Sequence, residues 1–151
     1  MLCVGIAFGD FAVKAWAQLS LVEPVTVASW FHLRVIHNRG LFLGLVPVFE
    51  MGLVHWMLLL PVALGAVFRM ATARCAAVAA GLAVALGGLT GNLIDRGRGA
   101  VVDYLAFGPF VQDKWLYMNI ADLAMLTGLM LLSTVLIRRQ VQRRHGRRRP
   151  V

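Results

Sequence analysis

The sequence predicts an all-α membrane protein with four transmembrane helices, plus a small β-sheet and a surface-lying helix outside the bilayer. Two observations predict this class. Of the 151 residues, 60% are hydrophobic and the mean hydropathy is +0.76, whereas water-soluble domains are about 45–50% apolar. Four segments also approach the length of about 20 mostly apolar residues that a helix needs to cross a bilayer. We therefore expect an integral membrane protein with a single domain.

The four predicted spans are residues 1–21, 52–68, 75–93 and 118–137. The first lacks the basic beginning of a cleavable targeting peptide and carries Asp10 and Lys14, which indicates a retained helix. The second contains Pro61, which a bundle tolerates when neighbouring groups satisfy the freed carbonyl. The third is rich in Ala and Gly. Because small residues let helices pack closely, this predicts a central position for it.

Basic residues are concentrated at the C-terminus, where the last fourteen positions hold seven of the fifteen Lys and Arg residues. Residues 1–137 thus form the membrane domain, and 138–151 form a basic tail. This tail is expected to be disordered and to contact anionic lipid rather than nucleic acid. Placing both termini in the cytoplasm puts nine basic residues inside and five outside, as the positive-inside rule favours. The nine are those of the tail with Arg69 and Arg74, and the five are Arg34, Arg39, Arg96, Arg98 and Lys114.

Two segments, 22–51 and 95–117, then lie outside the membrane. In the first, residues 29–37 alternate apolar and polar side chains, which predicts a strand. The sequence Asn38-Arg39-Gly40 that follows is a turn signal. In the second segment, residues 99–105 predict another short strand. We expect these strands and a surface-lying helix to cover the outer ends of the four spans.

Asp103 and Asp122 are the candidate catalytic residues. Asp103 follows the third span and Asp122 begins the fourth, so both are expected at the outer face. Carboxylates at the edges of lipid-facing segments are costly and are therefore candidates for function. Two carboxyl groups that share one proton can hydrolyse a peptide bond, because the ionised one deprotonates water while the protonated one polarises the carbonyl. The alternative is that each Asp caps or pairs structurally, since an acid in a first helical turn also suits the helix dipole.

The end of the third predicted span carries Asn92, Asp95 and Arg96. Asn92 and Asp95 are three residues apart and so share a helical face. We expect them to orient a catalytic carboxylate and Arg96 to face the substrate. The alternative is that Asp95 and Arg96 form an interfacial ion pair that ends the helix.

Two asparagines could serve either the site or local structure. Asn119 lies three residues before Asp122 and is a plausible N-cap for the fourth span, from which it could also orient the two acids. Asn38, beside Gly40, could bond the backbone of an extended substrate. It could equally be a turn residue.

Asp10 and Lys14 form the polar pair of the first span. Their i, i+4 spacing places them on one helical face, where they can pair. Either one alone would be costly in lipid, and pairing offsets much of that cost. We therefore expect a structural role, in which the pair links the first helix to the polar cluster.

The sequence predicts no metal or cofactor site. The spacing of His32, His37 and His55 matches no metal-binding pattern. Cys3 and Cys75 match neither a metal nor a redox pattern, which favours buried apolar roles. There is no serine–lysine or serine–histidine arrangement near the cluster, and no glycine-rich phosphate loop.

Four motifs that span nearly the whole chain carry a family resemblance. They are Asp10-x-x-x-Lys14, Asn38-x-Gly40, Gly91-Asn-Leu-Ile-Asp-Arg96 with Val101-Val-Asp-Tyr104, and Asn119-Ile-Ala-Asp122. With these motifs the chain resembles the lipoprotein signal peptidases, the type II signal peptidases of bacteria. The last two motifs are highly specific, including the 19-residue separation of Asp103 from Asp122.

The resemblance implies an aspartic endopeptidase that removes signal peptides from prolipoproteins. It would cut just before a cysteine that carries a diacylglyceryl group. The implied catalytic dyad is Asp103 and Asp122, and the implied supporting or substrate-contacting residues are Asn38, Asn92, Asp95, Arg96 and Asn119. The implied fold is four membrane helices with a small periplasmic β-sheet and a surface helix. The implied location is the bacterial inner membrane, and the resemblance implies no metal or organic cofactor. We expect a monomer.

The sequence departs from the family pattern after Asn38-x-Gly40. Leu41-Phe42-Leu43 places a large ring one position early, which would reshape the substrate cleft. One alternative is therefore a specialised or inactive paralogue. Another is a non-enzymatic scaffold or transporter subunit. That class predicts polar residues along the full membrane depth, whereas here they cluster at one end, apart from Asp10 and Lys14.

Overall fold

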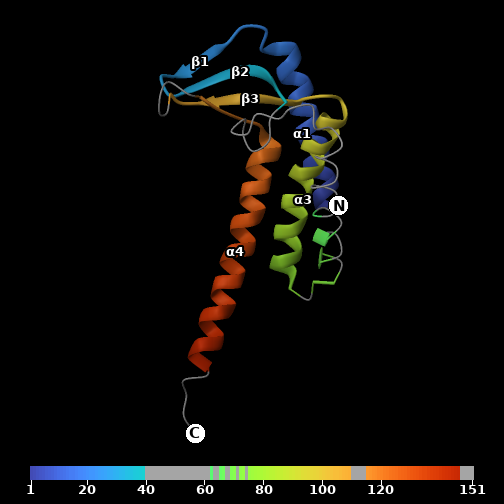
Figure 1. Ribbon diagram of the computed structural model, residues 1–151, viewed down its shortest axis with the longest axis vertical. Coiled ribbons are helices and arrows are strands. Elements are labelled where there is room, and N and C mark those ends of the chain that lie inside the picture. Colours follow the sequence, from blue (N-terminus) through green and yellow to red (C-terminus); the bar gives the residue numbers. More distant parts are fainter. Residues whose placement is uncertain are drawn as a thin grey trace.

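The computed structural model describes residues 1–39, 75–109 and 115–146, together with seven single positions between 62 and 73. These residues form three long helices and one four-stranded sheet (Figure 1). The helices are α1 (Leu2–Ser20), α3 (Ala76–Gly97) and α4 (Ile120–Gly146). The strands are β1 (Val25–Ala28), β2 (Phe31–Asn38), β3 (Val101–Phe107) and β4 (Leu116–Met118).

All three helices are long and apolar enough to cross a membrane. This confirms three of the four expected spans, with shifted boundaries. Helix α3 continues to Gly97 rather than ending at residue 93, so Asp95 and Arg96 are helical. Helix α4 begins at Ile120 because Leu116–Met118 pairs with β3 instead of starting a helix. The expected span 52–68, apart from a few single positions, lies outside the described residues. Gly40 and the Leu41–Leu43 stretch also lie outside them, and the described residues include no surface-lying helix.

The expectation of a disordered tail was wrong for its first part. Residues 138–146 continue α4 as helix, and only 147–151 lie outside the described residues. Arg and Gln are good helix formers, so a helix that is already nucleated within the membrane can continue through them. The basic side chains also suit the negative end of the helix dipole.

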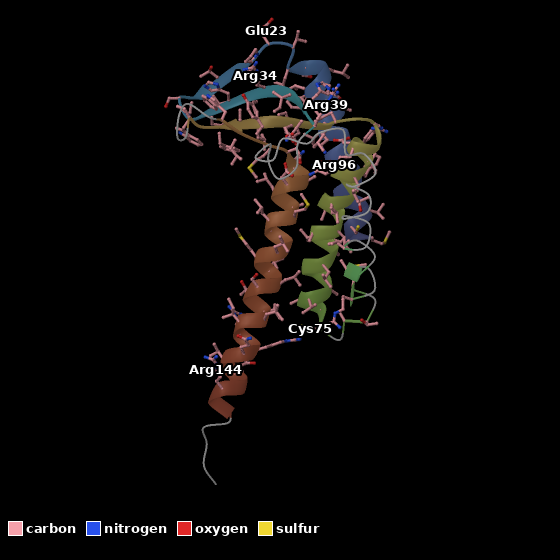
Figure 2. All side chains as sticks on the ribbon, in the orientation of Figure 1. Glu23, Arg34, Arg39, Cys75, Arg96 and Arg144 are labelled. Atoms are coloured by element: carbon pink, nitrogen blue, oxygen red, sulfur yellow. The ribbon has the colours of Figure 1, made fainter. Side chains whose placement is uncertain are left out.

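Charged side chains lie at the two ends of the helices (Figure 2). Glu23, Arg34, Arg39 and Arg96 lie at or near the end that carries the sheet, and Arg144 lies towards the other end of α4. Between these ends α1 and α4 expose large apolar side chains such as Phe8 and Met130. Apolar surface bounded by charge at both ends is what a bilayer requires, and the chain is a multi-pass membrane protein.

Helix α3 packs against both α1 and α4, through glycines. A Cβ at Gly87 would lie 2.7 Å from the Ile6 Cβ on α1, and one at Gly88 would collide with the Ala121 carbonyl oxygen on α4. A Cβ at Gly128 of α4 would lie 2.6 Å from the Ala85 backbone nitrogen. Contacts this close are possible only without side chains. Among the described helices, α3 therefore has the central position that its composition predicted.

We expect Gly88→Ala to destabilise the bundle by about 1–3 kcal/mol. The added methyl group would push on the backbone of α4 at Ala121, next to Asp122. Thermal unfolding in detergent measures the effect. Gly5→Ala is the matched control, since an added Cβ there meets nothing within 4 Å. Equal unfolding temperatures for Gly88→Ala and wild type would contradict the close packing.

The sheet is antiparallel, in the order β1-β2-β3-β4. It lies across the ends of the helices (Figure 1), and that end is called the sheet end below. Strand β2 confirms the alternating segment 29–37, and β3 confirms the segment 99–105, each shifted by about two residues. Strands β1 and β4, which have only four and three residues, were not predicted from the sequence.

Strand β3 is the buried centre of the sheet end. Its first four residues, Val101–Tyr104, are all buried. Tyr104 packs with Ala17 and Leu21 at the end of α1. Strand β3 pairs with β2 on one side and, through Leu105–Phe107, with β4 on the other. The third residue of this strand, Asp103, is thus a carboxylate held within a core position.

Candidate active site

Asp103 is held in β3 by two asparagines from different elements. Its side chain is 1% exposed. Asn38, the last residue of β2, donates from Nδ2 to Asp103 Oδ2 at 2.9 Å. Asn119 donates from Nδ2 to Asp103 Oδ1 at 2.7 Å. Burial raises the pKa of Asp103 to about 6, and the nearby charge of Asp122 adds to this, while the two asparagine bonds oppose it.

Asp122 lies in the first turn of α4 and is half-buried. Its Oδ2 accepts from the Asn119 backbone N–H at 3.1 Å, and its own N–H donates to Asn119 Oδ1 at 2.9 Å. This reciprocal pair is a capping box at the beginning of the helix, so the expected N-cap role of Asn119 is present. Asn92 Nδ2 donates to Asp122 Oδ1 at 2.8 Å. Both carboxylate oxygens are therefore held.

Asn119 joins the two acids. It is 0% exposed and bonds Asp103 through its side-chain nitrogen while it caps Asp122. The same nitrogen lies 3.1 Å from Asn92 Oδ1 and 3.2 Å from the Val102 carbonyl oxygen. Two acids 19 residues apart thus meet at one asparagine. They are close enough for the charge of Asp122 to act on Asp103.

Lys14 lies at the centre of a second polar group beneath the acids. Its ammonium group contacts Asp10 Oδ2 at 2.7 Å, Asp95 Oδ2 at 2.8 Å and Asn92 Oδ1 at 2.9 Å. Three acceptors match its three N–H donors, and its side chain is 3% exposed. The expected Asp10–Lys14 pair is present and reaches the cluster through Asn92. Its ion pair with Asp95, which links residues 81 positions apart, had no signal in the sequence.

The carboxylates of this second group also bind the backbone of other elements. Asp10 Oδ1 accepts the Ala121 N–H of α4 at 3.0 Å, and Asp95 Oδ2 accepts the Val102 N–H of β3 at 3.3 Å. The group therefore connects α1, α3, α4 and β3 in one network. It determines where the two acids above it stand relative to the membrane helices.

Arg96 brings a positive charge to the same end of α3. It is half-buried, and its charge acts on Asp122, Asp103 and Asp95. A cation beside two acids favours the state with one ionised carboxylate. Whether Arg96 also contacts substrate stays a prediction.

Two residues within the recognised motifs were not assigned roles from the sequence. Tyr104 Oη accepts the Ile120 N–H at 3.2 Å, at the beginning of α4, and burial raises the pKa of this phenol to about 12. Gly91 leaves room for Asp10, because a Cβ there would lie 2.5 Å from Asp10 Oδ2. In the sequence, the roles of Tyr104 and Gly91 were indicated only by their positions next to Asp103 and Asn92.

The chain is similar to known proteins over most of its length. A profile of the family described as Signal peptidase (SPase) II matches residues 2–138. The lipoprotein signal peptidase of Methylorubrum extorquens (strain PA1) is 39% identical over 133 residues, which cover 80% of this chain and 74% of that protein. The lipoprotein signal peptidase of Clostridioides difficile (strain 630) is 31% identical over 141 residues, which cover 87% of each.

A solved structure is also similar. It is described as a bacterial membrane enzyme determined by the in meso method at 2.3 Å resolution. It superposes with a TM-score of 0.77 and 18% identity, covering 91% of this chain and 85% of that one. At this identity the likeness shows a shared fold.

Proposed function

Since the chain belongs to the signal peptidase II family, whose members are aspartic endopeptidases of the membrane, we propose that Asp103 and Asp122 are its catalytic dyad. The chain is a lipoprotein signal peptidase in function, and the dyad is what the proposal adds. The observation that carries it is the pair of bonds from Asn119, which hold Asp103 at 2.7 Å and Asp122 at 3.1 Å. Asn119 uses two groups for this, its side-chain Nδ2 for Asp103 and its backbone N–H for Asp122, so one residue holds both carboxylates in place.

We assign the acid to Asp103 and the base to Asp122. Asp103 is almost fully buried and has a pKa of about 6, so it retains a proton more readily than an ordinary carboxyl group. Asp122 is half-buried and so can reach water. The ionised Asp122 takes a proton from water, and the resulting hydroxide adds to the scissile carbonyl carbon. Asp103 gives its proton to the carbonyl oxygen.

The resulting tetrahedral intermediate then breaks its C–N bond. Asp122 passes the proton that it took from water to the leaving nitrogen, and Asp103 recovers a proton from one hydroxyl group. The two carboxyl groups return to their starting state. Asn92 and Asn119 hold Asp122 in one orientation throughout. Asn38 does the same for Asp103.

The proposed substrates are prolipoproteins that carry a diacylglyceryl group on the cysteine after the cut. The support is the position of the two acids at the sheet end of three membrane spans. The acyl chains can remain in the bilayer while the peptide bond enters the polar cluster, so the membrane itself positions the substrate. We propose cytoplasmic termini and a dyad at the outer face of the bacterial inner membrane. In this arrangement Arg96 and Gly40 are further candidates for contact with substrate.

The test is release of the signal peptide from a synthetic precursor by the purified protein in lipid. We expect the diacylglyceryl precursor to be cleaved before its modified cysteine. The same peptide without the lipid should be cleaved with a kcat/KM lower by roughly 10²-fold, because its position is no longer set by the membrane. Mass spectrometry of the products gives both the site and the rate. Equal rates for the two peptides would refute lipid-assisted positioning, and no cleavage of either would refute the proposed substrate.

A further inference from the structure

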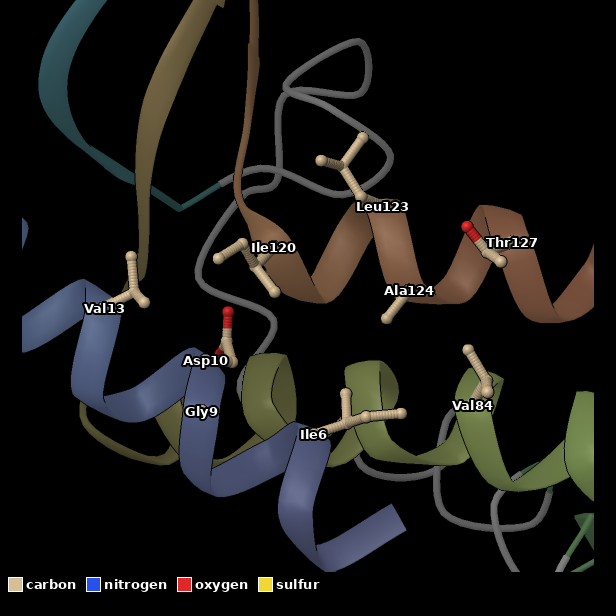
Figure 3. Close-up of a pocket in the computed structure, with 9 residues that line it drawn as sticks. All are labelled: Ile6, Gly9, Asp10, Val13, Val84, Ile120, Leu123, Ala124 and Thr127. Carbon is tan, nitrogen blue, oxygen red and sulfur yellow. The ribbon is translucent and has the colours of Figure 1, made fainter. Parts of the chain in front are cut away.

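An apolar groove of about 370 Å³ lies between α1 and α4 (Figure 3). It is lined from α1 by Ile6, Gly9, Asp10 and Val13, from α4 by Ile120, Leu123, Ala124 and Thr127, and from α3 by Val84. On each of the two outer helices the lining residues follow the i, i+3, i+4, i+7 spacing of one face. The groove is thus a strip about two turns long on each helix, and Asp10 is the one residue of the polar network described above that lines it.

The groove runs from the level of the two acids into the membrane. Helix α1 ends at the sheet and α4 begins there, so Val13 and Ile120 mark the sheet end and Ile6 and Thr127 the deeper end. Seven residues of helix give a length of about 10 Å. Ile120 and Leu123 belong to the same helical turn as Asp122. A molecule in the groove therefore ends beside the dyad.

We propose that this groove binds one acyl chain of the diacylglyceryl group on the substrate. The inference rests on the proposed function and adds a site to it. The lining is apolar except for Asp10 and Thr127, and the carboxylate of Asp10 is already paired with Lys14 and bonded to the Ala121 N–H. The groove also lies within the membrane spans, where hydrocarbon is the available ligand.

Size decides between an acyl chain and the helix of a signal peptide. An α-helix with side chains is about 10–12 Å across, and a helical segment would need far more room than about 370 Å³. A single aliphatic chain is thinner than a helix, and it can lie along a strip that is about two helical turns long. There is also open space at Gly9, where an added Cβ would meet nothing within 4 Å. This glycine keeps the strip clear on the side of α1.

The groove would act by orientation. Lipid is as apolar as the groove, so an acyl chain gains little transfer free energy by entering it. The chain is, however, joined covalently to the cysteine that follows the scissile bond. Fixing the chain between α1 and α4 therefore limits where the scissile carbonyl can lie relative to Asp122, which is a direct contribution to rate.

The test compares Gly9→Leu, which fills the groove, with Gly5→Leu. Gly5 is one turn earlier on α1, has equally open space, and does not line the groove. Two precursors are used, one with dipalmitoyl and one with dibutanoyl chains. We expect Gly9→Leu to lower the ratio of kcat/KM for the long-chain to the short-chain precursor by roughly tenfold. Gly5→Leu should keep the ratio of the wild type.

A second measurement does not depend on turnover. A precursor with a photoreactive diazirine near the end of one acyl chain is irradiated with the Asp103→Asn variant, and the labelled peptides are identified. We expect label near Ile6, Gly9 and Thr127. When Gly9→Leu is combined with Asp103→Asn in one protein, this label should be lost. An unchanged chain-length ratio in Gly9→Leu, or label confined to other segments, would overturn the inference.

Two further outcomes would identify a different occupant of the groove. An equal loss for both precursors in Gly9→Leu would point to the signal-peptide helix, and labelling by a diazirine phospholipid but not by the precursor would point to a bilayer lipid. Either result overturns the assignment to the substrate chain. If the wild type cleaves neither precursor, the proposed function fails, and the photolabelling still decides what the groove holds.

Discussion

Asp103→Asn is expected to lower the rate of cleavage by about 10³-fold or more while the protein still inserts and folds. Asparagine has nearly the same shape but cannot give a proton to the carbonyl oxygen, and loss of an acid or base typically costs 10²–10⁴-fold. Its amide oxygen can still accept from Asn119, and its NH2 group can donate to Asn38 once the Asn38 side-chain amide turns over, because in the wild type both asparagines donate to the carboxyl group. Signal-peptide release under single-turnover conditions measures the effect. Asp122→Asn should behave in the same way, and full activity in either variant would remove the dyad assignment.

The same substitution is expected to stabilise the protein at neutral and alkaline pH. The pKa of Asp103 rises from 3.8 to about 6 on folding, chiefly through burial. The folded state thus binds the proton more tightly than the unfolded state, and the stability that this proton contributes is present at low pH and lost as the pH rises through about 6. At 1.36 kcal/mol for each pKa unit, the buried charge destabilises the fold by about 3 kcal/mol above that range. An asparagine carries no such charge.

Thermal unfolding as a function of pH tests this directly. We expect Asp103→Asn to unfold at a higher temperature than wild type at about pH 8, with the difference disappearing towards about pH 4. Glu23→Gln is the matched control, because it removes an exposed carboxylate on the same side of the membrane spans. It should leave the unfolding temperature unchanged. Identical pH profiles for Asp103→Asn and wild type would show that the carboxylate is not held in a buried, charged state.

Lys14→Met should be the most destabilising single change in the polar network. It leaves Asp10 and Asp95 buried near each other without the ammonium group that contacts both, at 2.7 and 2.8 Å. Removing one partner of a buried ion pair typically costs about 3–5 kcal/mol. The yield of folded protein and its unfolding temperature in detergent measure the loss. Lys14 acts on the two acids only through its charge and through Asn92, which holds Asp122. Activity per folded molecule should therefore fall less than in Asp103→Asn, which removes a reacting group.

A triple variant separates charge from packing. Adding Asp10→Asn and Asp95→Asn to Lys14→Met removes the uncompensated charges and should restore most of the stability, since buried ion pairs can be replaced by neutral groups at little net cost. Asp10→Asn alone keeps the pair between Lys14 and Asp95 and should be milder than Lys14→Met. If Lys14→Met unfolds at the wild-type temperature, the network is not what joins α1 to the sheet end.

Local patterns predicted a large part of this molecule correctly. Apolar runs of the right length located α1, α3 and α4, because a bilayer imposes length and hydrophobicity on each helix independently of its neighbours. The capping of α4 by Asn119 and the pairing of Asp10 with Lys14 were also visible, since their partners are only three or four residues away. The prediction of disorder from charge was wrong at residues 138–146, because Arg and Gln have high helix propensity and α4 continues through them.

The sequence by itself thus determined three of the membrane spans, the two main strands and the identity of the polar residues, all of which follow from short-range periodicity and spacing. Only the tertiary structure decided how those residues meet. The contact of Lys14 with Asp95, the bond from Asn119 to Asp103 and the groove between α1 and α4 each join elements that are far apart in the chain. Such contacts depend on how helices pack through glycines such as Gly88 and how β3 sits across their ends. The glycines of α3 indicated close packing, but which residues meet has no local signature, because the energy that selects these contacts comes from burial shared among all the elements.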